Sequence, residues 1–312
     1  MLTIAAKKKH RGIKLNPVER VGMAVVYLIC IMAGILTIVP FLYIVAGSFA
    51  TEKELVERAF FIIPHTFSLN AYKYIIADGS IFRGLANSFF IMIAGTVVNM
   101  AFTTTLAYPL SKSNLKGRNV VLNVIIVTML FSGGMIPNYL VVKGLGLLDS
   151  YWALMLPGAV NAFNLIIVKN FFQELPHELE EAARIDGCSD VGIFAKIILP
   201  LSKPVISALG IFTAVGTWND YTQTLYYTKS ADIQTLSYYM LSITKASASA
   251  ASLGETMSAG ASSVLTTMSN SAANYKTIEL ACMVLSALPL IIVYPFAQKF
   301  FEKGVMVGSV KG

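Results

Sequence analysis

Residues 181–200 place charged, small and apolar side chains at a fixed spacing inside an otherwise apolar chain. A glutamate and two alanines open the segment, a glycine follows after three residues, and Ile-x-Leu-Pro closes it after nine more. These fixed positions are Glu181, Ala182, Ala183, Gly187, Ile197, Leu199 and Pro200. Such side chains suit contact with another protein rather than bond chemistry. We therefore interpret the segment as a module that docks on another protein.

Residues able to perform catalysis or bind a metal are few and scattered. The cysteines lack the spacing of a metal site, and the histidines are far apart. The phosphate-binding pattern G-x-x-x-x-G-K-[ST] does not occur in the sequence. We therefore predict a chain that is not an enzyme and has no catalytic residue, metal site or cofactor. If it uses a nucleotide to move a solute, ATP and Mg²⁺ would have to bind to another chain. The positions concerned are Cys30, Cys188, Cys282, His10, His65 and His177.

The composition indicates an integral membrane protein. Hydrophobic residues make up 55% of the 312, charged residues only 13%, and the mean hydropathy is +0.66. A soluble domain carries about 25% charged residues. The net charge of +7 comes from scattered basic residues, without a basic face interleaved with aromatic side chains. We therefore interpret this charge as a signal of membrane orientation and predict no binding to nucleic acid.

Six windows are apolar and long enough to predict membrane-spanning helices, since a span needs roughly 20 such residues. With both termini on the cytoplasmic side, 16 of the 24 Lys and Arg residues lie in cytoplasmic segments, as the positive-inside rule requires. The prediction is an all-α membrane protein with six spans and both termini cytoplasmic. The windows are Val21–Phe49, Leu85–Pro109, Val120–Pro137, Tyr151–Val168, Val205–Leu225 and Ile278–Phe296.

The spans divide the chain into a basic cytoplasmic tail (1–20), a first span with an outer segment (21–84), a core (85–298) and a C-terminal tail (299–312). Within the core we expect the docking segment at 172–203 and an outer insertion at 228–275. Residues 245–274 are rich in Ser and Ala, which favours a flexible insertion, although Ala and Met also permit a helix.

Ionisable residues are almost absent from the predicted spans. Asp220 lies near the outer end of the fifth window and Glu279 near the start of the sixth. Carriers that use ion gradients usually place acidic groups at mid-membrane. Amides within or beside the spans are interpreted as interhelical hydrogen-bonding groups, namely Asn87, Asn99, Asn123 and Asn161. The composition of the spans favours a neutral or hydroxyl-rich solute over an ion.

The local sequence of the docking segment predicts two short helices joined by a glycine turn. Residues 176–185 begin with a proline and carry acids in the first turns, which is favourable at a helix N-terminus. Asp186-Gly187 would end this helix, because glycine readily takes the left-handed conformation. Ser189 would cap a second helix that stops at Leu199-Pro200.

The spacing E-A-A-x3-G-x9-I-x-L-P resembles the cytoplasmic loop motif of the permease subunits of ATP-binding-cassette importers. The stretches FSLNAYKYIIADGSIFRGLANSFFI, TLAYPLSKSNLKGRN, TAVGTWNDY and FFEKGVMVGSVKG are similar to carbohydrate importer permeases, and more closely to the oligosaccharide-uptake subgroup. The likeness extends from about residue 20 to the end of the chain.

This resemblance implies the type I importer fold in a bacterial cell membrane. It implies a second, similar permease, two ATPase subunits and an extracytoplasmic solute-binding protein as partners. The first helix of the loop, around Glu181–Asp186, would sit in a cleft of the ATPase, with Glu181 making a charge contact there. The transported solute would be a carbohydrate, favoured as an oligosaccharide and possibly an acidic one.

Four residues near the outer end of the fifth span combine an indole, an amide, a carboxylate and a phenol: Trp218, Asn219, Asp220 and Tyr221. Such groups hold sugars by stacking and hydrogen bonding. The alternative interpretation is an aromatic belt at the membrane interface. Two alternatives for the whole chain are a permease of the same class for a non-carbohydrate solute, and a self-sufficient secondary carrier.

Overall fold

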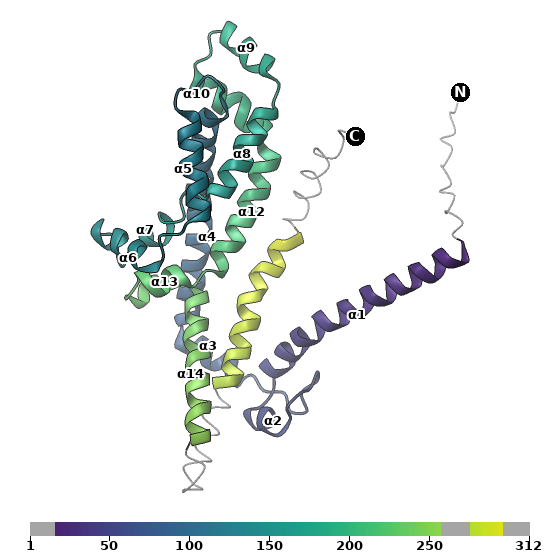
Figure 1. Ribbon diagram of the computed structural model, residues 1–312. Coiled ribbons are helices and arrows are strands. Elements are labelled where there is room, and N and C mark those ends of the chain that lie inside the picture. The colour runs from purple at the N-terminus through teal and green to yellow at the C-terminus, as the bar shows by residue number, and fades with distance from the viewer. Residues whose placement is uncertain (1–15, 257–274, 296–312) are drawn as a thin grey trace, which may run out of the picture.

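The computed structural model describes residues 16–256 and 275–295, and every regular element in these two ranges is a helix (Figure 1). Most of the predicted tail 1–20, the tail 299–312 and residues 257–274 lie outside the described residues. In chain order the elements are α1 Pro17–Ser48, α2 Glu52–Glu57, α3 Asn70–Asp78, α4 Ser80–Ser111, α5 Arg118–Leu130, α6 Met135–Gly144, α7 Tyr151–Met155, α8 Ala162–Glu174, α9 His177–Ile185, α10 Asp190–Ile193, the π-helix η1 Phe194–Ile198, α11 Leu199–Leu201, α12 Lys203–Asn219, α13 Thr222–Tyr227, the 3₁₀ helix η2 Ala231–Ile233, α14 Leu236–Thr256 and a last helix, Tyr275–Pro295.

Three helices in the described residues are long and apolar enough to cross a membrane: Glu19–Ser48, Ser80–Ser111 and Tyr275–Pro295. They coincide with the first, second and sixth predicted windows. A fourth candidate combines Asp190–Leu201 with α12, but the two halves are bent by 77°. Its second half covers most of the fifth window.

The third and fourth windows do not each hold one continuous helix. α5 ends at Leu130, and Gly134, with a φ of +83°, precedes the start of α6. In the fourth window α7 ends at Met155, and the chain passes Pro157-Gly158 before α8 begins. Glycine adopts positive φ readily and proline cannot donate a helical hydrogen bond, so the backbone breaks at these points even though the hydropathy stays high.

α4 forms the centre of the fold, because α8, α12 and α14 all pack against it (Figure 1). Small residues allow this close approach. A Cβ added to Gly84 would lie 3.3 Å from both the Cα and the backbone nitrogen of Leu236 at the start of α14. Ala107, which is fully buried, belongs to the cluster that also contains Val168 of α8 and Leu209 of α12. α4 therefore positions both the helices around it and the segments at its two ends.

Buried amides on α4 hold distant segments together, as predicted for Asn87 and Asn99. The Asn87 amide nitrogen donates to the carbonyls of Asp232 (2.7 Å) and Gln234 (3.0 Å), and the Tyr151 hydroxyl donates to its oxygen (2.8 Å). Asn99 donates to the carbonyl of Gly158 at 2.6 Å. The two other amides serve differently, since the Asn161 side chain caps α8 and the residue Asn123 is exposed on α5.

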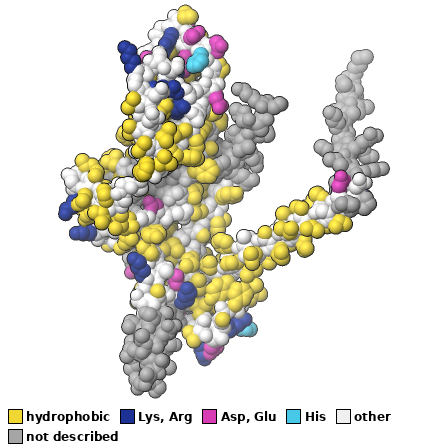
Figure 2. Space-filling view, in the orientation of Figure 1, with side chains coloured by type: hydrophobic (Ala, Val, Ile, Leu, Met, Phe, Trp, Pro, Cys, Tyr) yellow, Lys and Arg dark blue, Asp and Glu magenta, His cyan; other side chains and the backbone are white. Residues whose placement is uncertain are grey.

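α1 extends away from the rest of the molecule and is apolar along its length (Figures 1 and 2). None of its most apolar 18-residue window is buried, and Leu36 is 75% exposed. An apolar helix that leaves its side chains unburied belongs in lipid or against another subunit.

The segment between α1 and α3 is held by one buried carboxylate. Glu54 of α2 accepts hydrogen bonds from the backbone nitrogens of His65 (2.9 Å) and Thr66 (3.3 Å), and from Arg58 Nη1 (2.7 Å). Burial by itself would raise the pKa of Glu54, but these hydrogen bonds and the Arg58 charge outweigh it and lower the pKa below its ordinary value. The carboxylate therefore stabilises the loop in its ionised form.

The Ser/Ala-rich stretch is partly helical. α14 continues through residue 256, so the expectation of a flexible insertion is wrong for residues 245–256. Alanine has the highest helix propensity, and it outweighs the low complexity of this stretch. The remainder of the stretch, 257–274, lies outside the described residues.

Candidate coupling site

The predicted docking segment lies at one end of the molecule, where α9 and α10 project beyond α5, α8 and α12 (Figure 1). α9 covers residues 177–185, so the predicted helix is confirmed, with Pro176 preceding its first turn. Glu178 and Glu180 stand in that first turn and Arg184 in the last, each favourably placed against the helix dipole. Figure 2 shows charged side chains gathered over this end.

Gly187 ends α9 in the geometry of a Schellman motif. Its φ is +81°, its N–H donates to the Arg184 carbonyl (3.0 Å), and the N–H of Cys188 donates to the Ala183 carbonyl (2.9 Å). These bonds satisfy carbonyls that the end of a helix leaves without partners. The predicted glycine turn is therefore confirmed.

The second helix of the segment begins as predicted but does not end as predicted. The Ser189 side chain caps α10 by accepting from the N–H of Gly192 (3.2 Å). The chain then forms the π-helix η1 and continues through Pro200 to Leu201, so the prediction that Leu199-Pro200 ends the helix is wrong. Pro200 is tolerated because it stands in the first turn of α11, where a missing N–H costs little. The sharp bend follows at Ser202, where α12 takes a new direction.

The inner face of the segment is anchored in the protein core. Ala183 of α9, Ile193 of α10 and Ile198 of η1 are buried with residues of α4 and α8. Ile197 is partly buried against the same cluster, and Leu199 is half-buried. The helices are therefore held to the spans by packing as well as by the chain itself.

The outer face leaves most of the motif accessible. Large apolar side chains are exposed there as well, since Ile185 is 87% and Val191 75% exposed. Exposed apolar groups beside charges are typical of a surface that binds another protein. The predicted coupling residues are the seven motif positions and Asp186. Of these eight, the exposed ones are Glu181, Ala182, Asp186, Gly187 and Pro200.

A contact that the sequence did not reveal ties α9 to α4. Lys112 is the C-cap residue of α4, and its ammonium forms an ion pair with the Glu180 carboxylate. The two residues are 68 positions apart, and Glu180 precedes the motif by one residue. Beside the pair, Tyr108, Val191 and Phe194 help to line an open groove of about 820 Å³.

The four predicted solute-contact residues are not brought together. Trp218 is only 3% exposed, and its ring packs edge-on against Phe89 at 5.0 Å, within the core cluster around α3, α4 and α14. Asn219 and Tyr221 are exposed and Asp220 is half-buried. Asp220 Oδ1 accepts from the N–H of Thr222 and so starts α13. Only the last three residues of the set therefore present polar groups near the surface.

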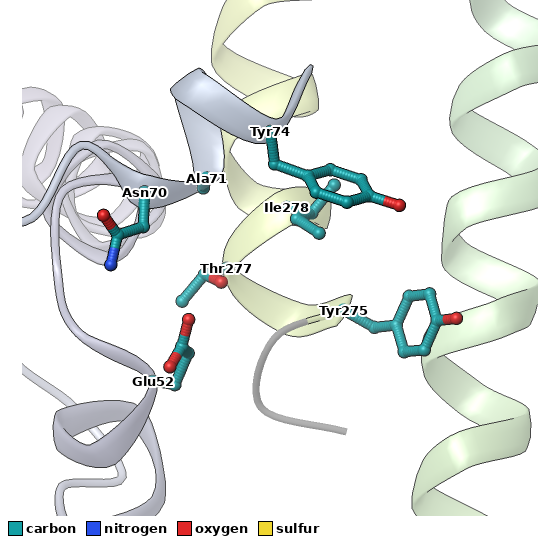
Figure 3. Close-up of a pocket in the computed structure, with 7 residues that line it drawn as sticks. All are labelled: Glu52, Asn70, Ala71, Tyr74, Tyr275, Thr277 and Ile278. Atoms are coloured by element: carbon teal, nitrogen blue, oxygen red, sulfur yellow. The ribbon is translucent and has the colours of Figure 1, made fainter. Parts of the chain in front are cut away.

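A pocket at the opposite end of the molecule was not predicted. It has a volume of about 360 Å³ and lies between α2, α3 and the last helix. Figure 3 shows Glu52 and Asn70 beside Thr277, with the Tyr74 ring next to Ile278 and Tyr275 at the start of the last helix. Carboxylate, amide, hydroxyl and aromatic groups thus meet there, but they come from three segments that are far apart in the sequence.

An all-helical chain with long apolar helices, which presents an anchored two-helix loop to a partner, has the architecture of a transporter's membrane subunit. Over residues 102–307 the sequence matches the family of the binding-protein-dependent transport system inner membrane component. The chain belongs to this family, and its fold is that of a type I importer permease in the cell membrane.

Three relatives illustrate the likeness. Protein LplC of Bacillus subtilis is 53% identical, with 89% of this chain and 91% of LplC covered. The polygalacturonan/rhamnogalacturonan transport system permease protein YtcP of the same species is 47% identical, with 92% and 97% covered. A chain in the crystal structure of a bacterial ABC transporter involved in the import of the acidic polysaccharide alginate is similar in structure. Its TM-score is 0.79 at 29% identity, with 92% of this chain and 99% of that chain covered.

Proposed function

We propose that this chain is the transmembrane subunit of an ATP-driven importer that moves carbohydrate across a bacterial cell membrane. The observation that carries the proposal is the two-sided α9–α11 segment, with its inner face packed against α4 and α8 and its motif residues exposed. YtcP and the alginate importer are named for uptake of polysaccharides, which supports a carbohydrate as the solute.

Hydrolysis of ATP takes place on two partner ATPase subunits, which also bind Mg²⁺, and a second permease completes the pore. Six spans with both termini in the cytoplasm put the α9–α11 segment on the side of the ATPases. When the ATPases close, they displace α9, and the bend at Ser202 passes the displacement into α12. Rigid-body movement of this kind requires different contacts in two states and no chemistry on the permease.

An extracytoplasmic binding protein delivers the solute to the opposite end. Asn219, Asp220 and Tyr221 are the candidate solute contacts on this chain, since Trp218 is packed in the core. YtcP is named for polygalacturonan and rhamnogalacturonan, which contain uronic acids, and the solved importer for the acidic polysaccharide alginate, so an acidic oligosaccharide is the first candidate. A non-carbohydrate solute carried by the same class of importer is the second candidate.

Uptake by the purified complex in proteoliposomes tests this function. The complex contains this chain, its partner permease, two ATPase subunits and the binding protein, and labelled oligogalacturonate is compared with a neutral oligosaccharide of equal length. The expected result is uptake that requires enclosed ATP and stops when the ATPase subunits are omitted. Uptake that continues without them, supported by an ion gradient, would instead identify a secondary carrier.

A further inference from the structure

The Lys112–Glu180 ion pair is the most enclosed one in the described residues. The Lys112 side chain is 18% exposed and that of Glu180 is 10% exposed. In residues 16–256 and 275–295 no other ion pair keeps both side chains below one fifth exposed. A partly buried pair is screened less by salt than a surface pair, and removing one partner leaves the other charge without its counter-ion.

The surroundings of Lys112 extend this contact to a third helix. Its Nζ lies 4.5 Å from the centre of the Tyr108 ring, a cation–π contact, and that ring lies 5.0 Å from the ring of Phe194 in η1. The carbonyl of Ser111, the residue before Lys112, accepts a hydrogen bond from the Gln173 side chain of α8 at 3.2 Å. The end of α4 is therefore joined to both helical halves of the docking segment and to α8.

Consecutive glutamates on α9 have opposite environments. Glu180 is buried against α4, whereas Glu181, the first motif residue, is exposed. On an α-helix consecutive side chains project about 100° apart, so one turn of α9 can face the partner and the core at once. The Glu180 carboxylate, which faces the core, has its counter-ion Lys112 at the end of α4.

We propose that Lys112 and Glu180 are positioning residues that transmit the displacement of α9 to α4. This inference rests on the proposed function, because it assumes that a partner ATPase moves α9. The pair adds a charged contact between α9 and the end of α4 to the packing of Ala183, Ile193 and Ile198 against the core. With the pair removed, the docking segment still binds the ATPase, but less of the displacement of α9 reaches this end of α4.

The test uses the complete complex and measures solute molecules imported per ATP hydrolysed. The ratio is measured on complexes purified as the full assembly, so that a loss of folded protein lowers uptake and hydrolysis together. Lys112→Met should lower the ratio about 2- to 30-fold, the range expected for residues that carry coupling between sites. Lys112→Arg, which keeps the charge and the ring contact, should retain it. Arg83→Met is the matched control, since it removes an exposed α4 ion pair at the other end.

Each possible result supports or overturns the role of the pair. An unchanged ratio in Lys112→Met, with the wild-type complex coupled, overturns the role of the pair and leaves the proposed function intact. Wild-type complex that hydrolyses ATP without any solute-dependent uptake overturns the proposed function and this inference with it. If Lys112→Met fails to assemble, the double variant Lys112→Met/Glu180→Leu replaces it, because no unpaired buried charge remains. A normal ratio in that double variant also overturns the inference, and a lowered ratio supports it.

Discussion

Gly187 offers the sharpest test of how the α9–α11 segment couples to its partner. The space around it is open, since a Cβ added there meets no atom within 4 Å, so the cost of a side chain comes from its φ of +81°. For an ordinary L-residue the left-handed conformation costs about 1–2 kcal/mol, and less for Asn or Asp. This is small beside a typical domain stability of about 5–15 kcal/mol, so variants at this position should fold.

The charge of the introduced side chain separates folding from coupling. Gly187→Asp and Gly187→Asn have nearly the same shape and both tolerate the left-handed conformation. Gly187→Asp adds a carboxylate to an exposed turn. Burying an unpaired charge costs several kcal/mol, so the closely docked state is disfavoured while the other contacts of the segment keep the ATPase bound. We expect the Asp variant to assemble but to import at least about ten-fold less solute per ATP, equivalent to about 1.4 kcal/mol. The Asn variant should lose much less.

The assay compares assembly, ATPase activity and uptake of the two variants and the wild type in the same proteoliposomes. Equal assembly with a selective loss of uptake in Gly187→Asp is the expected pattern. Normal uptake per ATP by Gly187→Asp would refute the conclusion that this turn docks on the ATPase. Equal losses in the Asn and Asp variants would show instead that backbone strain, and not charge, is responsible.

Four other variants test the fold of the chain. Glu54→Gln should lower the free energy of unfolding by about 1–3 kcal/mol at pH 7, because the buried, ionised acceptor of two backbone N–H groups and of Arg58 is lost. Since the folded state lowers the pKa of Glu54, this contribution is present above the ordinary value of 4.5 and disappears as the pH falls through the folded pKa. Thermal unfolding of wild type and Glu54→Gln should therefore differ at pH 7 and not at a pH below the folded pKa. Asn87→Ala leaves three polar partners unsatisfied and should cost about 2–3 kcal/mol in the same assay, with Tyr151→Phe costing less; equal stability of Asn87→Ala and wild type would contradict the described network. Trp218→Ala should destabilise the protein by about 3–5 kcal/mol, as expected for a buried aromatic side chain, and a variant with unchanged thermal stability but impaired uptake would return Trp218 to the solute pathway.

The sequence predicted the docking segment well because its structure is determined locally. Helix capping by Ser189 and the left-handed turn at Gly187 depend on neighbouring residues, so both could be inferred from residue type and spacing. Pro200 was misjudged, since a proline is tolerated in the first turn of a helix, which is where it stands in α11. The exposed positions of Glu181 and Asp186 also agree with a motif that meets a partner.

Features that depend on tertiary contacts could not be predicted in the same way. The backbone breaks at Gly134 and Pro157 have local causes, but a hydropathy window does not detect them, because apolar residues continue on both sides. Nor could it place Trp218 in the core, since a tryptophan near a span end is equally common at a membrane interface. Lys112 and Glu180 meet only after α4 and α9 have packed, and neither residue belongs to a recognisable motif.

ATPase activity of the reconstituted complex, measured with and without the binding protein and its sugar, tests the proposed function most directly. Neutral and uronic-acid oligosaccharides should be compared, with binding protein alone as the baseline. The expected result is stimulation by one of these sugar classes, which would couple solute recognition on one side to hydrolysis through the segment that contains Glu181. Basal hydrolysis that no sugar changes, in a complex shown to contain all its subunits, would contradict the assignment of carbohydrate as the solute.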